Sequence, residues 1–271
     1  MSHRGRDPGS CRLGLVPARY ACLVTRDWNA AAYDRLPIPM TRWGETVLGW
    51  LELAGDERVL DAGCGTGQVT ENLLARLPRG EVVALDGSDS MIERARERLG
   101  DDRVTYVVAD LQRPIAIAQP VDAVLSTATF HWVLDHDALF HNLAAVMRPG
   151  AHLVAQCGGE GNIASIEAAL HDMGEDFAGR KHYAGAERTR ERLRASGFAD
   201  VETWLHEEPS PIHASDLEAY LETICLGDHV EGMGDHERTA FVREVARRMP
   251  EPVIDYVRLN IRARRAASAT Q

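Results

Sequence analysis

The sequence is poor in lysine, in paired cysteines and in long apolar runs. Lys181 is its only lysine among 271 residues, so arginine carries nearly all the positive charge. The five cysteines are widely scattered and form no C-x-x-C pair. That pattern excludes a disulfide framework and a cysteine zinc site, and it suits a reducing cytoplasm. No apolar run approaches the length of about 18 residues that a membrane span needs.

Motifs of hydrolases and metal enzymes are also missing. The sequence contains neither G-x-S-x-G nor H-E-x-x-H, which leaves a hydrolase without support. His131, His136 and His141 recur every five residues, a spacing that does not place them on one helical face. We therefore predict no metal site.

Acidic residues outnumber basic ones by 41 to 30, for a formal net charge of −11. Such a chain repels phosphate backbones and anionic lipid, which disfavours nucleic acid and membrane surfaces as partners. Hydrophobic residues make up 45%, enough for a sizeable core. We expect a cytoplasmic protein with a small-molecule partner, as a monomer or weak homodimer.

The chain is predicted to hold one main domain. Residues 1–26 contain five arginines and an apolar run broken by Pro17 and Arg19, which indicates a disordered extension, with a targeting segment as the alternative. We place the domain at 27–265, with a helical insertion at 214–250, and a tail at 266–271.

Short apolar runs alternate with helical patterns, which predicts an α/β fold with a largely parallel sheet. The expected strands cover 58–60, 81–85, 104–108, 121–125, 151–156, 201–206 and 253–261. The expected helices cover 41–53, 68–77, 88–99, 137–147, 163–177, 187–195, 215–226 and 237–248. Strands six and seven thus bracket the insertion, which would lie over the carboxyl edge of the sheet, where such folds bind ligands.

A glycine-rich turn follows the first strand. Residues 59–67 read Val-Leu-Asp-Ala-Gly-Cys-Gly-Thr-Gly, with Asp61 two positions before the first glycine. Dinucleotide sites use G-x-G-x-x-G instead, with pyrophosphate at the helix N-terminus. A carboxylate beside a G-x-G-x-G turn suits a ligand with a cationic amino-acid part, such as S-adenosylmethionine.

Two more acids stand at the ends of the next strands. Asp86 follows strand two and can accept both ribose hydroxyls, and Asp110 follows strand three and can accept from the adenine amine. Each acid alone is equally explained by a helix cap or a solvated loop. Together, at these spacings, Asp61, Asp86 and Asp110 predict an adenosyl pocket.

Residues 59–67 and 83–92 resemble the class I S-adenosylmethionine-dependent methyltransferases. The likeness extends to the trans-aconitate 2-methyltransferases through 27–29 with Tyr33, through 130–136 and through 261–265. It implies a Rossmann-like seven-stranded sheet with strand seven antiparallel, helices on both faces, and S-adenosylmethionine as methyl donor. The loop 156–162 departs from the trans-aconitate pattern, which leaves the acceptor open.

The resemblance also implies roles for residues. It assigns the methionyl part to Asp61, Gly63 and Gly65, the ribose to Asp86, and the adenine to Asp110 and Leu111. The other predicted cofactor contacts are Tyr33, Arg42, Gly67, Gly87, Met91 and Ser126. The candidate acceptor contacts are Trp28, Thr127, His131, Trp132, Gln156 and Tyr183.

The predicted reaction is methyl transfer to a small molecule, at a carboxylate or hydroxyl oxygen. A hydroxyl needs a general base, for which His131 is the candidate, whereas a carboxylate needs none; a packing role for His131 is the alternative. The basic run 180–183 is either an anion site or a solvated helix end. Rival functions are a non-catalytic adenosylmethionine-binding protein and a nicotinamide-dependent oxidoreductase, which the glycine spacing opposes.

Overall fold

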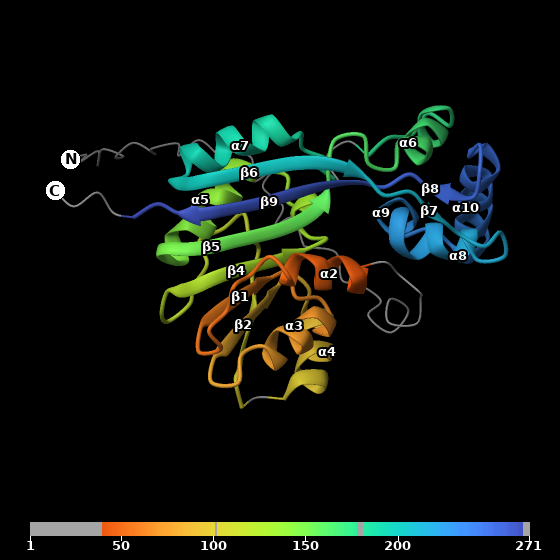
Figure 1. Ribbon diagram of the computed structural model, residues 1–271. Coiled ribbons are helices and arrows are strands. Elements are labelled where there is room, and N and C mark those ends of the chain that lie inside the picture. The colour runs from red at the N-terminus through yellow and green to blue at the C-terminus, as the bar shows by residue number, and fades with distance from the viewer. Residues whose placement is uncertain (1–39, 101, 178–180, 268–271) are drawn as a thin grey trace, which may run out of the picture.

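The computed structural model describes residues 40–100, 102–177 and 181–267, and a seven-stranded sheet runs through them (Figure 1). Its strands are β1 (Arg58–Ala62), β2 (Glu81–Asp86), β3 (Val104–Val108), β4 (Val121–Thr127), β5 (Met147–Gly158), β6 (Phe198–Glu207) and β9 (Val257–Arg265). The helices that flank the sheet are α2 (Met40–Leu48), α3 (Gln68–Ala75), α4 (Asp89–Leu99), α5 (His136–Val146) and α7 (Ala186–Ala195), whereas α6 (Ala164–His171) belongs to a separate apolar cluster.

The strand order is β3-β2-β1-β4-β5-β9-β6, and β9 runs antiparallel to both of its neighbours. The five strands from β3 to β5 are mutually parallel. Helices cover both faces of the sheet, so its middle strands are buried on both sides: Val59 and Leu60 of β1 are both fully buried although they point to opposite faces. The predicted fold, with an antiparallel seventh strand, is confirmed.

The carboxyl ends of the first strands are tied to one another. Gly63 N and Cys64 N both donate to Leu85 O, at 2.7 and 2.9 Å, which joins the glycine turn to the end of β2. Ala109 N donates to Asp86 O at 2.9 Å and joins the end of β2 to the residues after β3. These hydrogen bonds bring the predicted acidic positions to neighbouring places on one edge.

A second group of elements lies between β6 and β9, as predicted. It contains β7 (Ser210–Pro211), α8 (Leu217–Tyr220), the π-helical turn η2 (Leu221–Cys225), α9 (Gly227–Val230), α10 (Asp235–Arg248) and β8 (Val253–Ile254). Figure 1 shows these helices, with α6, beyond the carboxyl ends of β5 and β6. Their apolar side chains form a separate cluster that includes Trp43 of α2, whose ring meets Tyr256 edge-on at 5.0 Å. Within the described ranges, no helix combines the length and apolar character needed to cross a membrane.

Several predicted element boundaries differ from the structure. The helix predicted over 41–53 ends at Leu48 because the chain turns at Gly49, and the helix predicted over 163–177 ends at His171, before Gly174 with φ +80°. The final predicted strand, 253–261, is two strands, because Asp255 turns toward α6. Its carboxylate accepts from Ser165 N at 2.9 Å and from Ser165 Oγ at 2.7 Å. The second piece, β9, continues to Arg265.

Candidate functional site

The glycine turn after β1 combines a tight contact with an open side. Gly63 has φ +87°, and a Cβ atom there would lie 2.1 Å from Thr129 Oγ1. Gly65 has φ +54°, but a Cβ atom there would meet nothing within 4 Å. Gly63 is therefore required by the packing of the turn against the segment after β4, whereas Gly65 presents bare backbone to free space.

Asp86 lies beside that open backbone. Its Oδ2 accepts from Gly65 N at 3.0 Å, and its Oδ1 accepts from Ser88 N at 2.9 Å. Burial raises the pKa of Asp86, and these N–H groups counter part of the rise. Each carboxylate oxygen retains a further lone pair, so the group can accept from two adjacent hydroxyls at once.

Asp61 is directed into the protein. It is 2% exposed, and its Oδ2 accepts from the hydroxyl of Thr70 on α3 at 2.7 Å. Burial, with a contribution from the charge of Asp86, raises the pKa of Asp61 to about 7. The side chain thus joins β1 to α3 beneath the glycine turn.

Asp110 closes a turn of its own. Its Oδ1 accepts from Gln112 N at 2.8 Å within a turn, and among the described residues no helix begins between β3 and β4, so Asp110 caps no helix. The next residue, Leu111, is 5% exposed, and its carbonyl accepts from Asn142 Nδ2 at 3.0 Å. Together they place a partly exposed carboxylate next to a fixed apolar side chain.

The other predicted cofactor residues fall into different settings. Gly67, with φ +82°, caps α3, and Gly87 and Met91 lie at the start of α4, where Met91 N donates to Ser88 Oγ at 3.3 Å. Ser126 is buried and donates to Ala62 O at 2.6 Å.

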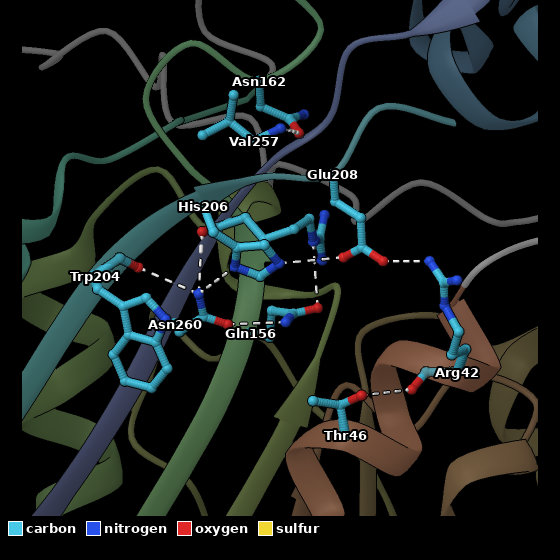
Figure 2. Close-up of polar contacts among 10 residues, drawn as sticks. Arg42, Thr46, Gln156, Asn162, Trp204, His206, Glu208, Val257 and Asn260 are labelled. Atoms are coloured by element: carbon cyan, nitrogen blue, oxygen red, sulfur yellow. Dashed lines mark hydrogen bonds and ion pairs between the residues drawn. The ribbon is translucent and has the colours of Figure 1, made fainter. Parts of the chain in front are cut away.

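Arg42 forms an ion pair with Glu208, so a carboxylate of the protein already engages the guanidinium that was assigned to the cofactor (Figure 2). Tyr33 and Trp28 lie outside the described residues.

The segment after β4 is held in a strained conformation. Ala128 has φ +56°, a left-handed value that is uncommon for a residue with a side chain, and its N–H donates to Gln156 O at 2.7 Å. Thr129 Oγ1 donates to Thr127 O at 3.0 Å. The hydroxyl of Thr127 is buried and has no hydrogen-bond partner. Backbone strain of this kind concentrates at functional sites.

His131 follows this segment and is half-buried. Its Nδ1 accepts from Gly158 N at 3.3 Å, and its ring lies 5.1 Å from the ring of Trp132 and 5.9 Å from that of Tyr183. Burial and the positive charges of Arg258 and Lys181 hold the pKa of His131 well below its ordinary value. The imidazole is therefore neutral and, because Nδ1 is an acceptor, carries its proton on Nε2.

Tyr183 and Lys181 complete the surroundings of His131. Burial raises the pKa of Tyr183, which keeps the phenol protonated. The ammonium of Lys181 donates to Cys225 O at 2.6 Å and lies over the rings of Trp132 and Phe177, at 4.8 and 4.3 Å. The predicted basic run therefore turns its lysine inward, toward η2 and these rings.

Gln156 belongs to a buried polar network across three strands. Its Nε2 donates to Asn260 Oδ1 at 2.8 Å, and its Oε1 accepts from Arg258 Nε at 3.3 Å. Figure 2 shows the link from Gln156 to Asn260 and onward to His206 and Glu208. Sequence reasoning missed Arg258, Asn260 and Thr129. The sequence of the last strand contains a signal for two of them, because the polar residues Arg258 and Asn260 alternate with the apolar residues at 257, 259 and 261.

These features fit S-adenosylmethionine. The carboxylate of Asp86 suits the ribose hydroxyls, the unfilled side of Gly65 admits a ligand against the backbone, and Leu111 offers an apolar surface to a base. Since the donors and acceptors come from successive strand ends, one extended nucleoside can contact them together.

Comparisons with known proteins agree on the family. Residues 59–150 match a family described as a methyltransferase domain. A trans-aconitate 2-methyltransferase of Methylobacterium nodulans is 32% identical over 181 residues, which are 66% of this chain and 67% of that protein. One from Variovorax paradoxus is 37% identical over 130 residues, about half the length of each protein (48% and 49%).

Solved structures support the same fold. A phosphoethanolamine N-methyltransferase of Haemonchus contortus, in complex with S-adenosylhomocysteine, has a TM-score of 0.57 at 19% identity and covers 84% of this chain and 53% of that one. The [4+2]-cyclase SpnF has a TM-score of 0.57 at 22% identity and covers 84% and 82%. The second likeness shows that the fold alone does not determine the reaction. Together with the sequence relatives, these comparisons establish that the chain belongs to the class I S-adenosylmethionine-dependent methyltransferases and resembles the trans-aconitate 2-methyltransferases among them.

Proposed function

We propose that this methyltransferase acts on a small organic acid and methylates a carboxylate oxygen. The observation that carries the proposal is the state of His131, the residue best placed to be a base. Its ring is neutral with a depressed pKa, and Nδ1 is occupied by Gly158 N. That leaves Nε2–H, a hydrogen-bond donor, to face an acceptor molecule.

A donor suits a carboxylate and does not suit a hydroxyl. A carboxylate is already ionised at neutral pH, so it needs orientation and no proton removal. A hydroxyl would require a base, and a histidine whose pKa is held low by burial and by Arg258 and Lys181 is a weak one. The same two positive charges favour an anionic molecule over a neutral one.

When bound, S-adenosylmethionine supplies an electrophilic methyl group on a sulfonium. The protein then has to place the acceptor oxygen in line with that methyl group. Asp86, the glycine turn and Leu111 would hold the donor, and His131 with the segment after β4 would orient the acceptor. Positioning two reactants in near-attack geometry can remove about 7–11 kcal/mol from a barrier, so no further chemical group is needed.

The relatives support the acceptor class. The curated relatives are named for trans-aconitate, which is itself a carboxylic acid. Residues 156–162, at the end of β5 and in the loop after it, include Gly158, Gly159 and Gly161, and they differ from the pattern expected of those enzymes. We therefore propose the class of small organic acids and not trans-aconitate itself.

Turnover with the purified chain tests this function. The protein is incubated with S-adenosylmethionine and a panel of small acids, phenols, alcohols and amines, and release of S-adenosylhomocysteine is measured. We expect turnover with acids, a product heavier by one CH2 group, and loss of that gain on alkaline hydrolysis, because an ester is cleaved where an ether or amine is not. A base-stable product would contradict the proposal.

Two variants of His131 test its role as a donor. His131→Gln keeps an N–H group, whereas His131→Phe keeps only the ring. We expect kcat to fall about tenfold or more in His131→Phe and to stay within about threefold in His131→Gln, because one hydrogen bond to a charged oxygen is lost only in the former. Equal losses in both variants, together with a wild-type rate that rises with pH through the lowered pKa of His131, would instead make His131 a general base.

A further inference from the structure

The guanidinium of Arg258 is a buried cation without an internal counter-ion. The residue is 2% exposed, and no ion pair connects it to any residue in the described part of the chain. Its Nη2 has no hydrogen-bond partner among the residues that the structure describes. Burial of a charge is costly unless a partner compensates for it, so an arginine in this setting is suited to a ligand of opposite charge.

The contacts that Arg258 does make fix its orientation. The guanidinium lies over the ring of Trp43 with its central carbon 3.8 Å from the ring centroid, and its Nε donates to Gln156 Oε1 at 3.3 Å. Gln156 is itself held by Asn260, which also donates to Trp204 O at 3.3 Å (Figure 2). Because one face of the guanidinium is covered by Trp43 and its Nε is bonded to Gln156, Nη2 can donate to a further acceptor that lies in the plane of the guanidinium.

The nearest acidic residue is already occupied. The negative charge of Glu208 is among those that raise the pKa of Arg258, against the larger effect of burial. However, the carboxylate of Glu208 pairs with Arg42 through Oε1 and with His206 Nε2 through Oε2 at 3.2 Å. Each oxygen of Glu208 thus has a partner other than Arg258, and no ion pair joins Glu208 to Arg258 among the described residues.

Strand register places Arg258 at the acceptor side of the site. Arg258 pairs with Gly158, and Gln156 pairs with Asn260 on one side and with Thr127 on the other. Because paired residues share a face and alternate residues return to it, Thr127, Gln156, Asn260 and Arg258 all lie on one face of the sheet. Thr127 and Arg258 thus flank Gln156, and each has a buried polar atom without a partner.

We propose that Arg258 is the residue that determines acceptor specificity, by binding an anionic group of the acceptor other than the oxygen that is methylated. This inference rests on the proposed carboxylate methylation. A carboxylate held by a guanidinium is a poorer nucleophile, because its charge is already neutralised. The reacting oxygen therefore belongs to a second group, oriented by His131, and the preferred acceptor carries at least two acid groups.

Binding measurements with matched ligands test the role of Arg258 without turnover. Fumarate and crotonate share a trans skeleton and differ in one carboxylate. With the protein loaded with S-adenosylhomocysteine, calorimetry should show fumarate bound more tightly than crotonate. Arg258→Gln should remove that difference and weaken fumarate binding about tenfold or more, because a charged hydrogen bond is lost. Arg258→Lys should retain part of the preference.

A matched control lies on the same strand. Arg262 is exposed and pairs with Glu202 at 3.5 Å, so Arg262→Gln should leave fumarate binding unchanged within about twofold. Affinity for S-adenosylhomocysteine should also stay within about twofold in Arg258→Gln, with native far-UV circular dichroism. Unchanged fumarate binding in that variant, equal losses for both acids, or a tenfold loss of S-adenosylhomocysteine affinity would each overturn the inference.

Turnover separates this inference from the proposed function. For any diacid that the wild type methylates, Arg258→Gln should raise KM about tenfold or more with little change in kcat, the signature of lost binding. If the wild type binds fumarate through Arg258 but forms no methyl ester with any acid, the proposed function fails and the assignment of an anion site to Arg258 stands. If esters form and the variant behaves as wild type, the assignment fails and the function stands.

Discussion

The two halves of the site are built in different ways. On the cofactor side, Asp86 and Asp110 lie at the ends of strands and accept from backbone N–H groups two positions later, those of Ser88 and Gln112. On the acceptor side, the contacts join distant parts of the chain, as Gln156 and Asn260 do across 104 residues. The first half consists of local motifs, whereas the second exists only once β9 pairs between β5 and β6.

This difference also separates the residues that bind the cofactor from those that select the acceptor. A strand-turn-helix unit positions backbone N–H groups and a carboxylate through local geometry, so many proteins can share it with the same nucleoside ligand. A network across β5, β6 and β9 can change residue by residue while the sheet persists. We therefore expect substitutions in the first half to affect every substrate equally, and substitutions in the second half to discriminate between acceptors.

Gly63→Val is the most severe test of the cofactor half. A Cβ at this position would lie 2.1 Å from Thr129 Oγ1, and the backbone has φ +87°, which a β-branched residue rarely adopts. We expect S-adenosylhomocysteine affinity to fall about 100-fold or more, with far-UV circular dichroism close to native. Titration calorimetry measures the affinity.

Gly65→Ala is the matched control for Gly63→Val. A Cβ at Gly65 would meet no atom of the protein, although φ is +54°. We expect native packing in this variant, so any loss of S-adenosylhomocysteine affinity reports the ligand's closeness to the turn. Wild-type affinity in Gly63→Val would contradict the assignment of this turn to the cofactor.

Asp86→Ala should have the next largest effect. Removal of its carboxylate takes away the acceptor for two ribose hydroxyls, so we expect S-adenosylhomocysteine affinity to fall about tenfold or more. Asp89→Ala, on the exposed first turn of α4, is the control and should change affinity less than about twofold. Calorimetry showing unchanged affinity in Asp86→Ala would remove this residue from the pocket.

Local signals account for what the sequence could predict. The ends of the first three strands were expected at acids, and the helix expected over 88–99 is α4, which begins directly after its cap Ser88. Hydrophobic runs and capping residues act over a few positions, so they can be read without knowledge of the fold. The order of the sheet followed from resemblance to a family and not from such signals.

The features of the site that the sequence did not predict depend on side-chain direction and on pairing between distant parts of the chain. Spacing placed Asp61 beside the turn but did not indicate that Thr70 would draw it into the protein. Arg42 pairs with Glu208, 166 positions later, a contact that spacing did not indicate, and its contact with the cofactor stays a prediction. Arg258 escaped notice because a polar residue on a strand suggests solvent, and only the packing of Trp43 reveals that this face is buried.

The titration of Asp61 should give the smallest effect, and it is the most specific test of the cofactor half of the site. Burial raises its pKa to about 7, from an ordinary value of 3.8, so the buried carboxyl is neutral at pH 6 and ionised at pH 8. A raised pKa means that the folded protein binds a proton that the unfolded chain releases. The protein without ligand should therefore lose stability as the pH rises from about 4 through 7.

Cofactor affinity should move in the opposite direction. The ionised carboxylate attracts the ammonium group of the methionyl part, so binding favours the charged form of Asp61. With a pKa near 7 the ionised fraction rises about tenfold between pH 6 and pH 8, and S-adenosylhomocysteine affinity should rise by about the same factor. Asp61→Asn keeps an acceptor for Thr70 and should flatten both trends, in calorimetry for affinity and in thermal unfolding for stability. If Asp61→Asn retained the full pH dependence of affinity, the amino-acid part of the cofactor would have to lie away from β1. The spacing of the acids in the sequence would then predict only the part of the pocket that holds the nucleoside.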